Sequence, residues 1–423
     1  MKNLYYLLLL FLLLSPSCLK EEENLFSEPP AERIDKALSE YKSVLASSEK
    51  GWLLEYYPHP EQIYGGWNFV MKFTTSSVTA YSEIFGDPTE EYESLYQLIS
   101  DDGPVLSFDT YNDFLHFFST PSGSQYQAYQ GDYEFIIMGM SDDKNEIQLK
   151  GKKTGNKMVL RRISENPESY LTKVMETEEK IEASSYTLHV NGKVFDCYLD
   201  DRVLSFEYTD VNNEVVVVEV AYCVTDKGIR LYEPTEIDGI TVQEFLADDT
   251  HLTSLDGKII INYHFIPVNE DFVNSIPKTT YYLFDSASNL LDVCDAMKTW
   301  NQTITSLAYA SAYRLTYLRL TMTYYSSNPS FMFYASQTSG SVFQFIYGYK
   351  ISIVNGTEDK VKFESTVSNL NANASLTPFF ISEFIAKILA EETYILTPDK
   401  RVKPNEYKFT SERDPNIWFY IYK

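Results

Sequence analysis

The fold is decided by residues 65–81, which read GGWNFVMKFTTSSVTAY. Aromatic and β-branched side chains dominate both halves of this stretch, and a short polar segment at 74–76 separates them. This pattern is typical of two antiparallel strands that are joined by a turn. The stretch therefore predicts a β-hairpin, and similar patterns recur on both sides of it.

Further strands are predicted by short apolar runs elsewhere in the chain. They lie at residues 52–57, 104–108, 114–118, 133–138 and 147–149. Successive strands without helices between them favour a meander over a β-α-β arrangement. The glycine- and lysine-rich segment 151–157 lacks the spacing of a phosphate-binding loop, so we interpret it as the loop of a hairpin.

Helical spacing or helix-start signals occur in four segments. These are residues 31–48, 167–181, 288–304 and a segment that starts near Pro378, with Thr377 as its candidate cap. Helices that are separated by long β stretches predict an α+β fold. We therefore expect mostly antiparallel, meander-like sheets with about four helices.

The chain has 423 residues, which at about 150 residues per domain predicts two or three domains. We place an N-terminal α+β domain at 31–185 and a C-terminal α+β domain at 186–423. One order of elements (strand, acidic turn, strand, helix, strand) is expected at 133–188 and again at 349–396. Both a duplication and a coincidence among β-rich segments would produce this internal repeat.

The composition is that of a folded protein with a strong negative charge. Apolar residues make up 44% and charged residues 22% of the chain, which argues against wholesale disorder and against a multi-span membrane protein. The chain carries 60 Asp and Glu against 35 Lys and Arg, a net charge of −25. Such a field repels phosphate backbones, so we expect no nucleic-acid binding.

The N-terminus has the features of an export signal. Lys2 precedes an apolar run from Leu4 to Leu14, which is too short to span a bilayer. Small residues then lead to Cys18, an arrangement that resembles the lipobox of bacterial lipoprotein precursors. We expect residues 1–17 to be a signal peptide and Cys18 to be lipidated, which would anchor the protein to a membrane. An ordinary signal peptide with a chance cysteine is the alternative.

Residues 18–30 are expected to form a lipidated acidic tether. Cys18 is followed after one residue by a cation and three acids: Lys20, Glu21, Glu22 and Glu23. This order resembles the surface-export signal of Bacteroidetes lipoproteins, although a solvated charged tether would look the same. We therefore expect an outer-membrane protein that is exposed at the cell surface.

The remaining cysteines and the histidines predict no metal or cofactor. The three other cysteines, Cys197, Cys223 and Cys294, have no C-x-x-C spacing and fit neither a disulfide framework nor a zinc ribbon. Cys197 and Cys223 either pair or stay as buried free thiols, which we favour. The histidines are scattered at positions 59, 116, 189, 251 and 264 without a metal-binding pair. The acidic segment 248–251 is interpreted as a solvated loop.

No motif identifies a reaction, whereas the aromatic content points to binding. The chain has no G-x-S-x-G, and its carboxylates are too many for sequence to choose a catalytic pair. Aromatic residues make up 15% of it, including 34 Tyr. Exposed tyrosines suit sugar or peptide recognition, although cross-strand packing is the alternative for each ring. The first candidate surface is the loop with Tyr57, Tyr64 and Trp67.

Several phrases of the sequence are shared with a known family. They are GW at 51–52, GGWNF at 65–69, GPVLSFDTY at 103–111, GDYEF at 131–135 and GKKTGN at 151–156. Together they resemble the Bacteroidetes lipoprotein family catalogued as domain of unknown function 4302, most strongly over residues 31–245. The resemblance implies no catalytic residues. It implies a place beside an outer-membrane transporter and its binding lipoprotein in a nutrient-uptake system.

These observations predict a non-catalytic surface lipoprotein, an accessory or ligand-binding component in the uptake of glycans or peptides. One alternative is a cell-surface hydrolase of glycans or peptides, which would need converging carboxylates or a nucleophile beside its base. The other is a structural or adhesive envelope protein. A binding protein should instead present an exposed aromatic surface.

Overall fold

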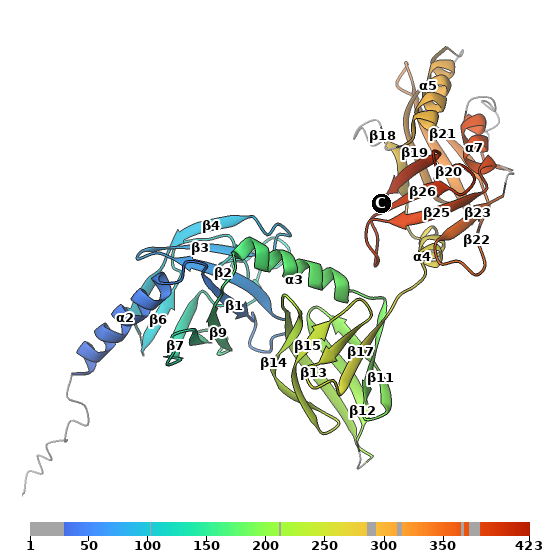
Figure 1. The fold of residues 1–423 in the computed structure, drawn as a ribbon. Helices are drawn as coiled ribbons and strands as arrows, with labels where there is room; N and C mark the ends of the chain where they lie inside the picture. Colours follow the sequence, from blue (N-terminus) through green and yellow to red (C-terminus); the bar gives the residue numbers. More distant parts are fainter. Residues whose placement is uncertain are drawn as a thin grey trace, which may run out of the picture. The chain divides into compact units, whose positions relative to one another are not determined.

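The computed structural model describes residues 29–101, 103–210, 213–285, 293–310, 315–364, 368–371 and 381–423. Cys18, Lys20 and the acids at 21–23 lie outside the described residues, as do Thr377 and Pro378. The fold is α+β with antiparallel sheets, as predicted, and its strands form three sheets (Figure 1).

The first sheet has nine strands in the order β4-β3-β2-β1-β9-β8-β7-β6-β5. Its strands are β1 (Trp52–Tyr56), β2 (Trp67–Phe73), β3 (Ser77–Ser82), β4 (Glu91–Leu95), β5 (Gln97–Ser100), β6 (Pro104–Ser107), β7 (Glu134–Met140), β8 (Glu146–Gly151) and β9 (Lys157–Arg162). The predicted hairpin at 65–81 is confirmed, since β2 and β3 pair antiparallel with Met71 opposite Ala80. Two meanders, β1–β4 and β5–β9, are joined where β1 pairs with β9.

Helix α2 (Pro30–Ala46) contacts strands of this sheet, and its Val44 and Leu45 belong to the hydrophobic cluster of the sheet. Trp52, Phe69, Phe108 and Phe114 are almost completely buried there. Burying an aromatic side chain of this size contributes roughly 2–3 kcal/mol, so each of these rings stabilises the first sheet. The segment at 151–157 forms the loop between β8 and β9, as predicted.

The predicted strand at 114–118 is wrong. These residues form turns within the long connection 108–133, which joins β6 to β7. Asn112 is the cause, because its side-chain oxygen accepts hydrogen bonds from the amides of Phe114 and Leu115, both at 3.1 Å. A side chain that takes up backbone donors in this way competes with strand pairing.

The second sheet closes into a barrel of eight consecutive strands. They are β10 (Ser185–Val190), β11 (Lys193–Asp200), β12 (Val203–Thr209), β13 (Val215–Val224), β14 (Gly228–Ile237), β15 (Ile240–Ala247), β16 (His251–Ser254) and β17 (Ile259–His264). Helix α3 (Pro167–Ile181) precedes it, with the bounds expected from sequence. Cys197 and Cys223 are buried and unpaired, and so is Cys294 outside the barrel. Burial raises the pKa of Cys197 to about 12, which keeps this thiol protonated.

The third sheet has ten strands in the order β22-β23-β25-β26-β27-β18-β19-β20-β21-β24. They are β18 (Tyr281–Asp285), β19 (Leu315–Tyr325), β20 (Asn328–Gln337), β21 (Val342–Gly348), β22 (Ile351–Ile353), β23 (Lys360–Phe363), β24 (Ser368–Asn369), β25 (Thr393–Pro398), β26 (Glu406–Ser411) and β27 (Trp418–Tyr422). The region also contains helices α4 (Val268–Ser275), α5 (Asp295–Ala310) and α7 (Ile381–Ala390). The short α4 was not predicted. The predicted helix at 288–304 overlaps α5, which ends six residues later, while residues 288–292 lie outside the described residues.

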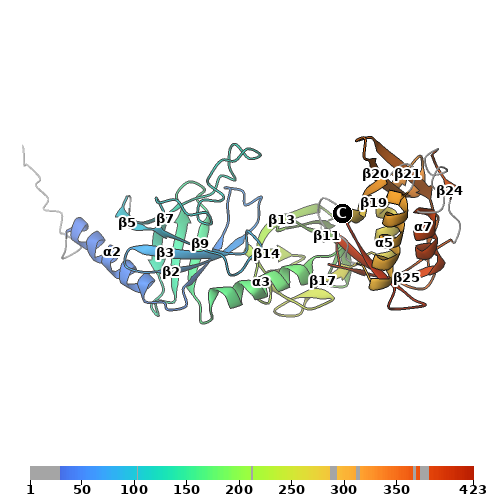
Figure 2. The same cartoon turned by 90° about the horizontal axis from the view of Figure 1, so that it is seen from above.

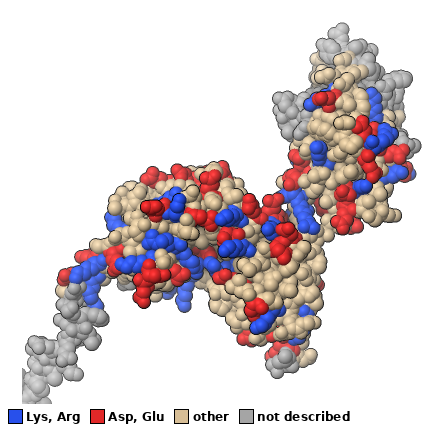
Figure 3. Space-filling model, viewed as in Figure 1, with Lys and Arg blue, Asp and Glu red and all other residues tan. Residues whose placement is uncertain are grey.

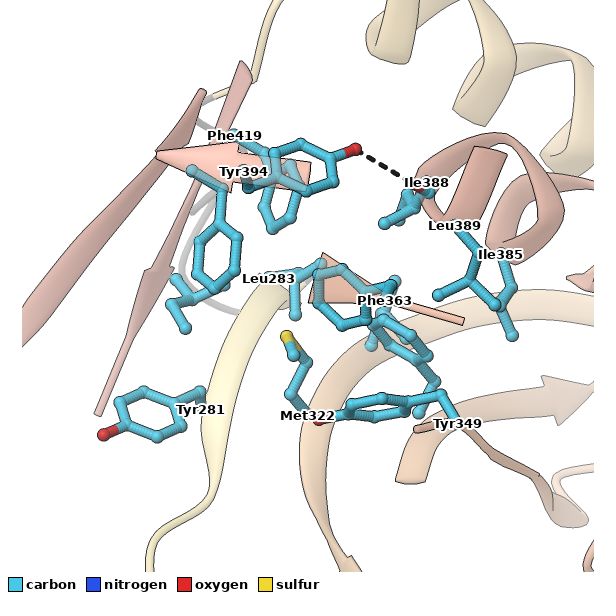
Figure 4. Packing of buried hydrophobic residues seen from close by; sticks show 14 of the residues in the cluster. Tyr281, Leu283, Met322, Tyr349, Phe363, Ile385, Ile388, Leu389, Tyr394 and Phe419 are labelled. Carbon is cyan, nitrogen blue, oxygen red and sulfur yellow. Dashed lines mark hydrogen bonds between the residues drawn. The ribbon is translucent and has the colours of Figure 1, made fainter. Parts of the chain in front are cut away.

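One hydrophobic cluster joins the three helices to this sheet. Ile385, Ile388 and Leu389 of α7 pack toward Tyr394 and Phe419 of the sheet (Figure 4). The Tyr394 hydroxyl donates a hydrogen bond of 2.9 Å to the carbonyl of Ile388, which satisfies its buried polar atom. Helices α5 and α7 lie side by side (Figure 2). The helices therefore cover one face of the sheet.

The chain divides into two compact units. The first contains residues up to Thr177 together with 201–203 and 221–232, and the second contains the remainder from Glu178 on. The boundary expected between residues 185 and 186 falls at the start of β10. The two segments of the suggested repeat differ in topology, because β10 opens the barrel whereas β25 pairs with β23 of its own sheet.

Candidate ligand-binding surface

The three aromatic residues of the predicted loop lie at different depths. Tyr57 is only 3% exposed, and its ring packs edge-on against Tyr232 with centroids 4.7 Å apart. Tyr57 therefore does not present its ring to a ligand, in contrast to the expectation from sequence. Tyr64 and Trp67 are half-buried, and the Trp67 Nε1 donates a hydrogen bond of 3.0 Å to the carbonyl of Tyr64.

Tyr64 belongs to a continuous row of five rings, each in contact with the next. His59 lies 5.9 Å from Tyr64, Tyr64 lies 5.0 Å from Tyr129, Tyr129 stacks on Phe117 at 5.6 Å, and Phe117 lies 5.6 Å from Phe85. Phe85 is 44% exposed, and each of the other four is partly exposed. We call these five residues the ring row. They come from three loops, 57–66, 83–90 and 108–133.

Sequence reasoning found only Tyr64 of this row. Phe117 lay in the strand wrongly predicted at 114–118, while Phe85 and Tyr129 lay in segments without a distinctive pattern. The one available signal was the connection 108–133 itself. Connections longer than about 12–15 residues without regular structure are uncommon in compact domains and are often functional.

The backbone beside the ring row adopts the left-handed conformation at four residues other than glycine. These are His59 (φ 68°), Gln62 (φ 52°), Ala128 (φ 55°) and Gln130 (φ 59°). The left-handed conformation of a residue other than glycine costs on the order of 1–3 kcal/mol of folding free energy, so it persists only where the surrounding structure enforces it. Ala128 and Gln130 flank Tyr129, so the strained backbone holds a ring of the row in place.

Asn156, in the turn between β8 and β9, holds the loop at 57–66. Its side-chain amide is buried and donates to the carbonyls of Tyr57 (2.9 Å) and His59 (2.8 Å). Its oxygen accepts a hydrogen bond of 2.6 Å from the side chain of Gln62. The left-handed residues His59 and Gln62 are thus fixed by one side chain from the sheet.

The far end of the connection 108–133 is held by Tyr56 and Asp132. The Tyr56 hydroxyl donates to the Asp132 carbonyl at 3.1 Å and accepts from the Asp132 amide at 2.7 Å. Burial and the nearby Asp132 carboxylate raise the pKa of Tyr56 well above its ordinary value, so this hydroxyl stays protonated. The Asp132 carboxylate accepts hydrogen bonds from the amides of Lys153 and Thr154, which ties the connection to the turn between β8 and β9.

Behind the row, Trp67 lies between Phe118 and the buried Arg202. Its ring is 5.6 Å from Phe118, and the Arg202 guanidinium lies 3.9 Å from the indole centroid. Arg202 is 6% exposed and donates a hydrogen bond of 2.9 Å to the Glu83 carboxylate. Trp67 is therefore a supporting residue of this surface, since a buried ion pair fixes one side of its ring.

The three loops of the ring row carry acidic side chains but no lysine or arginine, since loop 57–66 has Glu61 and loop 83–90 has Glu83, Asp87 and Glu90. The connection 108–133 has three aspartates and no lysine or arginine, and one of the three, Asp132, is buried. Burial lowers the pKa of His116 below its ordinary value of 6.5, so this imidazole is neutral at pH 7. Beside these carboxylates, the row itself offers tyrosine hydroxyls, the His59 imidazole and apolar ring faces to a ligand.

Other predicted features have structural roles. The Asp248 carboxylate accepts hydrogen bonds from the amides of Thr250 (2.7 Å) and His251 (2.8 Å), which makes this segment a turn. Within the described ranges, no group of three or more His, Cys, Asp or Glu is placed to hold a metal ion. Among the same residues, no helix is long and apolar enough to cross a membrane.

A family model described as domain of unknown function (DUF4302) matches residues 22–249. The chain belongs to this family. The DUF4302 region contains the first sheet, α3 and most of the barrel, and thus all five residues of the ring row. The ten-stranded sheet follows the DUF4302 region. No curated protein matches the chain.

Solved structures that match include DNA polymerase sliding clamps. The clamp from Pseudomonas aeruginosa is 10% identical, with 92% of this chain and 96% of that chain covered and a TM-score of 0.13. A beta clamp from Helicobacter pylori is also 10% identical, with the same coverage and a TM-score of 0.12. At these scores the likeness carries no argument about the DUF4302 region or the rest of the chain.

Proposed function

We propose that this protein is a non-catalytic surface lipoprotein that binds a glycan or a peptide for a nutrient-uptake system. The observation that carries the binding role is the ring row, in which three loops bring five partly exposed rings into contact. Apolar ring faces pack well against the CH-rich faces of sugars and against peptide side chains, and tyrosine hydroxyls add hydrogen bonds. The strained backbone beside the rings fits a preformed binding surface.

The anchor and location are part of the same proposal. Lipidation of Cys18 would attach the protein to the outer membrane, and Lys20 with Glu21, Glu22 and Glu23 would direct it to the cell surface. The family resemblance supports a place beside an outer-membrane transporter and its binding lipoprotein. In that setting, the ring row would hold a ligand for uptake without changing it.

The binding role is tested with the purified mature protein and a panel of glycans and peptides, by calorimetry or on arrays. Once a ligand is found, its affinity is measured for three variants of the row, namely Tyr64→Ala, Tyr129→Ala and Phe85→Ala. Each variant should lower the binding free energy by about 1–2 kcal/mol, which raises the Kd roughly ten-fold. Tyr126→Ala is the matched control, because Tyr126 lies in the same connection and is 79% exposed but is outside the row. Equal effects of all four variants would contradict the proposal.

Turnover is measured on the same panel. Binding without release of products is the expected result. Products whose formation is abolished by changing one carboxylate would establish the hydrolase alternative, since glycosidases work through such groups.

A further inference from the structure

The outer face of the third sheet carries a second row of aromatic side chains. Trp418, Tyr420 and Tyr422 alternate along β27 with Phe419 and Ile421, which are buried in the core. Side chains alternate between the two faces of a strand, so the three partly exposed rings lie opposite the helices that cover the core face. Their centroids are 5.8 Å and 6.3 Å apart along the strand.

The register of neighbouring strands defines the rest of this face. On one side, Lys408 and Thr410 of β26 lie opposite Tyr420 and Trp418. On the other side, Tyr282 of β18 lies opposite Tyr422. The face therefore offers a line of ring surfaces bordered by one cation (Lys408), one carboxylate (Glu406) and hydroxyl groups.

Lys408 is the cation of this face. Its ammonium lies 4.8 Å from the centroid of Trp418 and 5.5 Å from that of Tyr420. Within the described part of the chain, no carboxylate lies in ion-pair distance of Lys408, whereas Lys360 on β23 pairs with Glu412 at 2.7 Å. Glu406 lies opposite Tyr422 at the far end of the row. The cation is thus available to an anion that lies along the rings.

We propose that the outer face of β26 and β27 binds an acidic polysaccharide. The rings stack against the CH faces of successive pyranoses, while Lys408 binds a carboxylate or sulfate group of the chain. A line of three rings fits a chain ligand better than a single small molecule. Single-stranded nucleic acid is disfavoured, because it is bound in a basic groove that follows its phosphates, whereas this face carries a single lysine beside its rings.

This site is independent of the ring row. It lies beyond residue 249, where the DUF4302 match ends, and it selects for negative charge, whereas the ring row has no cation of its own. The proposal therefore adds a second ligand class to the molecule.

The test uses the full mature chain and affinity electrophoresis or calorimetry with polygalacturonate, alginate and chondroitin sulfate. The expected result is binding to at least one of them, weakened about ten-fold by Lys408→Gln and by Tyr420→Ala. Polygalacturonate and its methyl-esterified form share a backbone but differ in charge, so if polygalacturonate is bound, the ester should bind about ten-fold more weakly. Binding that falls with added salt would agree with a contribution from Lys408.

Three controls make the outcome decisive. Tyr64→Ala should leave binding of the acidic polymer unchanged, and Lys408→Gln should leave binding at the ring row unchanged. Melting temperatures of Lys408→Gln and Tyr420→Ala separate loss of the site from loss of the fold, and Lys408→Gln decides the outcome if Tyr420→Ala does not fold. Absence of binding to all three polymers, equal binding of the charged and esterified forms, or preferential binding of a single-stranded oligonucleotide would overturn the proposal.

Discussion

Trp67 and Tyr64 lie three residues apart but contribute to different properties of the protein. Trp67 packs between Phe118 and Arg202, whereas Tyr64 lies in the row of partly exposed rings. Trp67→Ala should therefore lower the free energy of unfolding by about 2–3 kcal/mol, because it removes a packed ring beside a buried ion pair. Tyr64→Ala should lower it by less than about 1 kcal/mol. Denaturant titration of both variants checks this, and equal losses would mean that Tyr64 is a core residue.

His116 should make stability depend on pH. Its ring stacks on Tyr133 at 5.4 Å, and burial lowers its pKa below 6.5 in the folded protein. As the pH falls below about 6.5, the unfolded chain binds this proton before the folded protein does, so the free energy of unfolding decreases. Above that pH the contribution is constant. Denaturant titrations at several pH values measure the free energy of unfolding of the wild type and of His116→Phe. Between pH 7.5 and about 5 the variant should lose less stability than the wild type. Curves that fall in parallel would show that His116 does not cause the pH dependence.

At the scale of elements, sequence patterns identified the pieces with strong local signals. The hairpin at 65–81 and helix α3 were predicted because their apolar spacing matches the period of a strand or a helix. The run at 114–118 was mistaken for a strand, because its composition gives no indication that the side chain of Asn112 takes two of its amides. The ring row could not be predicted, because contacts between residues far apart in sequence assemble it.

Gly131 shows how tightly the connection 108–133 is held at its end. A Cβ atom at Gly131 would lie 2.2 Å from the Tyr56 hydroxyl oxygen and 2.7 Å from the Phe118 Cβ. Gly131→Ala should lower the free energy of unfolding by about 1–3 kcal/mol, because the added methyl group overpacks this site. Gly123→Ala is the matched control in the same connection, since nothing lies within 4 Å of a Cβ there. Thermal unfolding compares the two, and a neutral Gly131→Ala would show that this end can shift without cost.

At the scale of the whole molecule, the charge of the protein bears on the proposed anchoring. On the face seen in Figure 3, acidic and basic side chains are interspersed over the first unit. The net charge of −25 favours solubility and repels anionic surfaces. If Cys18 is lipidated as proposed, the lipid rather than the charge of the protein would attach these aromatic surfaces to the membrane.

Cys18→Ala tests that anchoring. The variant should leave the membrane fraction and lose its acyl mass, because the thiol that carries the lipid is gone. When protease is added to intact wild-type cells, it should cleave the folded part of the protein from the cell surface. A variant that stays membrane-bound and is processed normally would refute lipidation, and protection until the outer membrane is broken would refute surface exposure.

The membership of residues 201–203 and 221–232 in the first unit has an evolutionary consequence. Arg202 and Arg230 come from the barrel sequence, yet they neutralise the buried Glu83 and Glu55 of the first sheet. A gene fragment that ended after α3 would leave the buried Glu83 without its cation and Glu55 with Arg161 alone, and a buried carboxylate that loses its partner is strongly destabilising. Recombination between these segments should therefore be selected against, so that the first sheet and the barrel are inherited as one piece.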